Sequence, residues 1–153
     1  MPATETRTPV IRNAGTRPAH PRKLFVNIAV SDLQRSIDFF EQLGFTFNTQ
    51  FTDATATAML VGEDAYFMLL TREKFAEFSR RPVADARQAT QALYAISVDS
   101  RAEVDALANR AIAAGGTHAH DPRDHGFMYQ SSFHDLDGHH WEVFWMDPAV
   151  LAQ

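Results

Sequence analysis

The chain carries one sequence pattern twice, and this repeat limits its fold more than any other feature. In each copy a strand-like run leads into a short polar cap, a stretch with apolar residues at helical spacing, and a glycine. Val30–Asp32 and Gly44 in the first copy correspond to Val98–Ser100 and Gly115 or Gly116 in the second. Three further strand-like runs follow in each copy, so the sequence predicts the order βαβββ twice.

Two such modules predict an α+β fold. We expect the first module at residues 24–71 and the second at residues 90–148, joined by a polar connector at residues 72–89. Four strands cannot bury both faces alone, so the modules should lie side by side as a curved mixed sheet around a concave cavity, with the helices outside. The concave face is the natural ligand site. A length of 153 residues suits a single domain over residues 24–148.

The first 23 residues differ from the rest of the chain. They contain four prolines and five basic residues against one acid, and they lack hydrophobic periodicity. This composition predicts a disordered basic tail. The segment has no apolar core of the kind found in secretory signals.

Composition excludes several function classes. The chain has no cysteine, which rules out disulfides, thiolate metal sites and a cysteine nucleophile. The formal net charge of −5 argues against a nucleic-acid partner. No apolar run approaches the roughly 18 residues of a transmembrane helix. We therefore expect a cytoplasmic protein that has a small-molecule partner and does not contact membranes.

The last strand places polar and apolar side chains on opposite faces. It follows the turn sequence Asp135–Gly138, and side chains alternate along a strand. One face carries His140, Glu142 and Phe144, and the other carries Trp141, Val143 and Trp145. The Trp/Val face must be a core face. Glu142 then either looks into a cavity or needs a buried partner.

Three segments resemble the vicinal-oxygen-chelate superfamily, which includes glyoxalase I, fosfomycin-resistance proteins, bleomycin-binding proteins and extradiol dioxygenases. They are Val30–Phe40, Leu43–Phe45 and Asp135–Glu142. Within this superfamily the chain is most similar to a predicted lactoylglutathione lyase-like group, through Met68–Phe75 and Gly126–Tyr129. The resemblance covers Leu24 to Pro148 and implies the glyoxalase-like fold, which hosts several chemistries.

The resemblance also implies a divalent metal held by one residue from each of four strands. These positions fall on Phe25, about Leu69, about Leu93, and Glu142, and only Glu142 has a ligand atom. We therefore expect no cofactor and no glyoxalase I chemistry. A substitute metal site of Glu142 with His140 or His134 is the alternative.

The remaining histidines favour less specific interpretations. Six of the seven histidines lie between His118 and His140. We expect His118, His120 and His125 to be solvated and paired with nearby charges, and His139 to be exposed at the turn. Two interpretations of Glu142 stay open: a catalytic base or substrate anchor, or a carboxylate paired with Arg72 or a strand tyrosine.

Two function hypotheses follow. In the first, the protein binds or transforms a small metabolite in an apolar pocket, with Glu142 as the catalytic residue. In the second, it is a non-catalytic protein that sequesters a drug-like or aromatic ligand. The predicted pocket residues are Phe25, Asn27, Leu69, Leu93, Tyr129, His140 and Phe144. The resemblance also suggests a homodimer.

Overall fold

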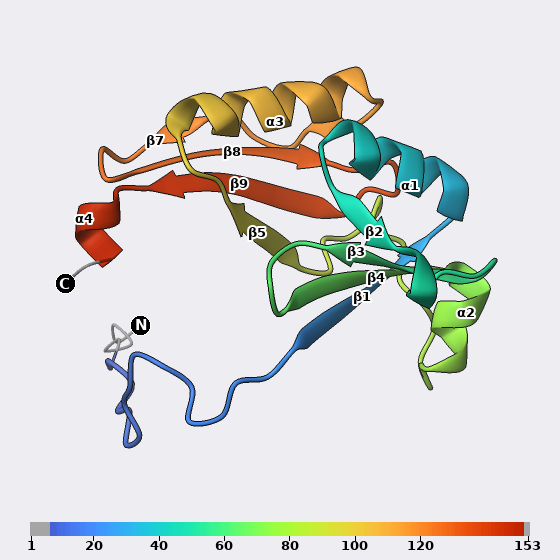
Figure 1. Cartoon of the computed structure of the whole chain (residues 1–153), viewed down its shortest axis with the longest axis horizontal. Coiled ribbons are helices and arrows are strands. Elements are labelled where there is room, and N and C mark those ends of the chain that lie inside the picture. The colour runs from blue at the N-terminus through green and yellow to red at the C-terminus, as the bar shows by residue number, and fades with distance from the viewer. Residues whose placement is uncertain (1–6, 152–153) are drawn as a thin grey trace, which may run out of the picture.

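The computed structural model describes residues 7–151. The first module has the predicted order of strands and helix, and the second has one two-residue strand more than predicted (Figure 1). The first module contains β1 (Leu24–Val30), α1 (Leu33–Gln42), β2 (Thr46–Asn48), a short 3-10 turn (Thr49–Phe51), β3 (Ala56–Leu60) and β4 (Ala65–Thr71). The second contains β5 (Leu93–Ser97), α3 (Arg101–Ala113), β6 (Thr117–His118), β7 (Arg123–Asp124), β8 (Met128–His134) and β9 (His140–Met146). The connector forms α2 (Arg72–Glu77), and α4 (Pro148–Leu151) follows β9.

The strands form two mixed sheets, which confirms the α+β fold. The first sheet has the order β1-β4-β3-β2, and the second has the order β5-β9-β8-β6 with β7 also on β8. Each module pairs its first and last strands in parallel, β1 with β4 and β5 with β9. Among the described residues the strands pair into two separate sheets, one for each module, whereas we expected one curved sheet.

Local polar groups start the helices at the predicted positions. The Asp32 side chain accepts a hydrogen bond from the Arg35 N–H at 3.1 Å, and the Ser100 side chain accepts one from the Glu103 N–H at 3.2 Å. Each bond satisfies a donor that the first helical turn leaves free. α3 then lies along one face of the second sheet (Figure 1). We call the opposite face of that sheet its open face.

An aromatic cluster joins the two modules. Trp141 of β9 is fully buried and lies 4.6 Å from Phe67 of β4 and 5.3 Å from Phe40 of α1, measured between ring centroids. Phe133 of β8 lies 6.2 Å from Phe39 of α1. Buried aromatic pairs of this kind contribute apolar burial and about 0.5–1.5 kcal/mol beyond it. The core therefore lies between the modules.

The turn between β8 and β9 ties the second module to the end of β1. The Ser31 N–H donates to Asp137 Oδ1 at 2.8 Å, and His139 Nε2 donates to the Ala29 carbonyl at 2.7 Å. The expectation that His139 is exposed was therefore wrong: its side chain bridges two modules and is 3% exposed.

The N-terminal segment has no helix or strand from residue 7 to residue 23, and each of these residues is exposed. The predicted disordered tail also includes residues 1–6, which lie outside the described residues. Within residues 7–151, no helix combines the length and the apolar character that a membrane crossing requires.

We predict that Gly138→Ala destabilises the fold more than Gly126→Ala. Both glycines have positive φ, +87° and +81°, so each alanine has the same backbone cost of about 1–2 kcal/mol. At Gly138 the added Cβ would also lie 2.8 Å from the Arg87 backbone nitrogen, whereas at Gly126 it meets nothing within 4 Å. Urea unfolding should show about 1–3 kcal/mol of additional loss for Gly138→Ala. Equal losses for the two variants would contradict this prediction.

Candidate functional site

A cavity of about 520 Å³ lies over the open face of the second sheet. Its lining comes from β5, β7, β8, β9 and the loop after β6. The apolar lining residues are Leu93, Ala95, Met128, Phe144 and Met146, and the polar ones are His120, Arg123, Gln130, His140 and Glu142. The volume falls within the range typical of small-molecule sites.

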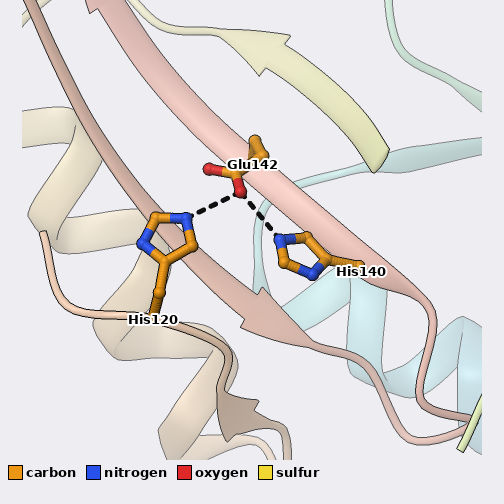
Figure 2. A group of neighbouring side chains, drawn as sticks. All are labelled: His120, His140 and Glu142. Atoms are coloured by element: carbon orange, nitrogen blue, oxygen red, sulfur yellow. Dashed lines mark hydrogen bonds and ion pairs between the residues drawn. The ribbon is translucent and has the colours of Figure 1, made fainter. Parts of the chain in front are cut away.

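Three of the polar side chains form one cluster, in which both imidazole rings point at the same carboxylate (Figure 2). His120 Nε2 and His140 Nε2 each lie 2.7 Å from Glu142 Oε1. The three side chains are between 14% and 20% exposed, so they are shielded but still reachable from the cavity. His140 and Glu142 belong to β9, whereas His120 comes from the loop between β6 and β7.

Ser132 on β8 holds the His120 loop over β9. The His120 N–H donates to Ser132 Oγ at 3.0 Å, and Ser132 Oγ donates to the His120 carbonyl at 3.3 Å. Ser132 lies directly opposite Glu142 in the β8–β9 pairing. The position of His120 is therefore fixed by the same strand pair that positions the carboxylate.

The two carboxylate oxygens of Glu142 have different surroundings. Oε1 is the oxygen that both histidines approach, whereas Oε2 is buried and has no hydrogen-bond partner among the described residues. A carboxylate oxygen in such a place costs free energy unless a proton, cation or ligand satisfies it. The cluster can therefore accept a proton, hold a cation or bind a polar group.

His134 lies beside the cluster but outside it. Its ring centroid is 5.2 Å from that of His140, in an edge-on arrangement, and its side chain borders a different cavity with Arg87 and Gly138. Burial, followed by the charge of His140, lowers the pKa of His134. Of the two histidines predicted as substitute metal ligands, His140 belongs to the cluster and His134 does not.

The structure brings three of the predicted pocket residues to the cavity, namely Leu93, His140 and Phe144. Two others lie on the first sheet instead. Phe25 is 48% exposed and stacks on Tyr66 at 4.6 Å, and Asn27 lines a separate cavity of about 670 Å³ beside α2.

Leu69 and Tyr129 were placed on the wrong face. Leu69 is fully buried on β4 and pairs with Ile28 of β1, which is also in the core. Tyr129 faces α3, where its hydroxyl donates to Asp105 Oδ1 at 2.6 Å. In both strands the alternation of side chains puts the neighbouring residues on the other face.

Sequence reasoning missed His120 as a site residue, together with Arg123 and Gln130. His120 was expected to be solvated, because nothing in a loop sequence identifies a partner 22 residues away. The predicted partners of Glu142 were also wrong, since Arg72 Nη2 instead donates to the Val83 carbonyl at 3.3 Å. Gln130 could have been predicted from the sequence: it follows Tyr129 on a strand, so its side chain lies on the face opposite to the one that packs against the helix.

The four-strand metal set implied by the resemblance does not fit this structure. Phe25 and Leu93 offer no lone pair, and Leu69 in addition faces the core. Glu142 alone could bind a metal among those four positions.

Comparison with protein families matches residues 22–143 to the Glyoxalase/Bleomycin resistance protein/Dioxygenase superfamily. No curated protein matches the chain. Among solved structures, a hypothetical protein from S. aureus has 25% sequence identity and a TM-score of 0.71, with 83% of this chain and 95% of that chain covered. A family enzyme from Burkholderia phytofirmans PsJN has 22% identity and a TM-score of 0.66, with 80% and 96% covered.

A third solved structure, described as lactoylglutathione lyase from Agrobacterium tumefaciens, has 17% identity and a TM-score of 0.61. It covers 84% of this chain and 95% of its own length. At that identity the likeness shows a shared fold.

We predict that His120→Ala lowers the free energy of unfolding by about 1–3 kcal/mol, because Glu142 loses one of its two partners in a shielded position. His118→Ala is the matched control, since His118 is exposed on β6 and its side chain makes no hydrogen bond within residues 7–151. That variant should stay within about 0.5 kcal/mol of the parent. Urea unfolding of all three proteins measures the difference, and similar values for both variants would show that the cluster does not stabilise the loop.

Proposed function

This chain belongs to the glyoxalase/bleomycin resistance protein/dioxygenase superfamily, and we propose that it binds a small metabolite in the cavity over the open face of its second sheet. The observation that carries the proposal is the cluster of His120, His140 and Glu142 in a cavity with extensive apolar lining. A ligand with an apolar body and a polar head would match both parts.

The apolar lining supports binding of the ligand body. Leu93, Met128 and Phe144 come from three adjacent strands and face the same space. Covering apolar surface contributes roughly 25 cal/mol per Å², so 100 Å² of ligand contact would contribute about 2.5 kcal/mol. Gln130 and Arg123 add hydrogen-bond donors for an oxygen-rich head.

The carboxylate supports a transforming role. Glu142 lines the cavity and its side chain is 16% exposed, so its carboxylate could take a proton from a bound molecule while both histidines hold Oε1 in place. General bases need this reach and this fixed orientation. In the proposed reaction class, Glu142 accepts a proton from the metabolite and returns it to another atom of that molecule.

The alternative is a non-catalytic binder of a drug-like or aromatic ligand. It is supported by the loss of the four-strand metal set and by the apolar lining of the cavity. In this case the cluster anchors the ligand head without proton transfer. A homodimer and a cytoplasmic location also stay predictions, and light scattering on the purified protein measures the first.

Glu142→Gln separates the two functions, because it keeps the shape of the side chain and removes its charge. The assay is a screen of small carbonyl and carboxylate metabolites for binding and for conversion by the parent protein. If Glu142 is a base, the variant should retain affinity for a converted compound and lose about 10²–10⁴-fold in rate. Binding without conversion by the parent protein would leave the sequestering function, and conversion at the parent rate by the variant would remove Glu142 from the mechanism.

We predict that Phe144→Ala weakens binding of anilinonaphthalene sulfonate, a probe with an aromatic body and an anionic head, by about 10–100-fold. The physical reason is the lost apolar contact, since truncating a buried phenylalanine contact removes about 1.5–3 kcal/mol. Phe78→Ala is the control, because Phe78 is 74% exposed and lines the separate cavity beside α2. Fluorescence titration measures both. A loss with Phe78→Ala alone would move the ligand site to the first sheet.

A further inference from the structure

We propose that His120, His140 and Glu142 form a site for one divalent first-row metal ion, whose remaining coordination positions face the cavity. One candidate ligand atom from each of the three residues lies within 4.8 Å of the other two. The inference deepens the proposed function, and it rests on that function only in placing the head of the small molecule beside the metal.

The first argument comes from the two ring nitrogens of His120. Nδ1 lies 2.8 Å from the Asp121 carbonyl oxygen, and Nε2 lies 2.7 Å from Glu142 Oε1. Both neighbours are hydrogen-bond acceptors, whereas a neutral imidazole has a single N–H. If Nδ1 donates its proton to the Asp121 carbonyl, the lone pair of Nε2 faces the lone pairs of Glu142 Oε1, and this contact is repulsive. A cation bound to both atoms would remove the repulsion.

This arrangement is the one that metal-bound histidines adopt. A ligating histidine commonly donates its other N–H to a backbone carbonyl, which fixes both the tautomer and the ring orientation. Asp121 supplies that carbonyl, and Ser132 holds the His120 backbone at the neighbouring peptide groups. His120 therefore has the outer contacts that a metal ligand needs before any metal is bound.

The second argument comes from the carboxylate. Two imidazole nitrogens converge on Glu142 Oε1, and Oε2 is buried without a partner among the described residues. A carboxylate has about four lone-pair positions, so the observed contacts leave much of its capacity unused. A metal ion bound between the three side chains would engage the carboxylate charge directly.

The donor set selects the kind of metal. Two imidazole nitrogens and one carboxylate favour zinc or iron(II) over magnesium or calcium, which prefer oxygen ligands alone. Three protein ligands also leave coordination positions free, and Arg123 and Gln130 line the same cavity. The polar head of a bound metabolite could occupy such a position.

The proposed site differs from the four-strand set in its origin. All three ligands come from the second module, within residues 120–142, and two of them are neighbours on one face of β9. The first module contributes none. The proposed site therefore does not depend on Phe25, Leu69 and Leu93, which have no ligand atoms.

The test uses the full chain without an affinity tag, stripped with EDTA and titrated separately with Zn²⁺ and Co²⁺. We expect calorimetry to show one Zn²⁺ per chain and Co²⁺ to give visible absorption bands on the unmodified protein. His120→Gln, His140→Gln and Glu142→Gln should each weaken Zn²⁺ binding at least 10–100-fold, the loss that even outer contacts of a metal site produce. His118→Ala, the exposed control, should titrate like the parent protein.

Several outcomes would overturn the metal site. The first is that the parent protein takes up no Zn²⁺ and shows no Co²⁺ bands. The second is that His118→Ala loses as much Zn²⁺ affinity as the variants of the cluster. The third is that the cluster variants bind Zn²⁺ like the parent protein while circular dichroism shows that they are folded. The Co²⁺ spectrum needs no variant, so a misfolded variant does not weaken the test. Failure here leaves the proposed function intact if the stripped protein still binds anilinonaphthalene sulfonate and Phe144→Ala still weakens that binding.

Discussion

The tie between the β8–β9 turn and the end of β1 sets the relation between the modules. Asp137 accepts a hydrogen bond from the Ser31 N–H, and His139 donates one to the Ala29 carbonyl. Within the turn region, Asp135 accepts a hydrogen bond from Trp141 Nε1 at 2.9 Å. Burial raises the pKa of Asp135, while the charge of His139 and the hydrogen bonds to the carboxyl oppose that rise. Buried polar ties of this kind cost desolvation, so their main effect is to select one arrangement of the modules.

β9 extends that constraint from the core to the cavity. Trp141 and Val143 are fully buried on one face, and His140 and Glu142 occupy the other. Because successive side chains of a strand share one backbone, the packing of Trp141 against Phe40 and Phe67 also fixes the direction of Glu142. The carboxylate is thus held by core packing that no ligand has to supply, which is what preorganised sites require.

Local rules predicted the elements and failed where distant segments meet. Alternation identified both faces of β9, and the caps located both helices, because these signals lie within a few residues of each other. Leu69 was misplaced because a shift of one residue moves a side chain to the other face of a strand. His120 and His139 could not be assigned, because their partners Glu142 and Ala29 lie 22 and 110 residues away.

The two modules share the βαβββ order, with β7 added in the second, but their open surfaces differ. In the second module imidazole and carboxylate groups gather over the sheet. In the first, Phe25 stacks on Tyr66 and the Asn27 side chain donates to the nearby Phe25 carbonyl. The first module instead packs Phe67 and Phe40 against Trp141, directly behind the strand that carries Glu142. The two copies of the module therefore have different roles: the first packs against β9 and fixes its position, and the second carries the imidazole and carboxylate groups. Changes to the first module should therefore reach the cluster through the aromatic contact.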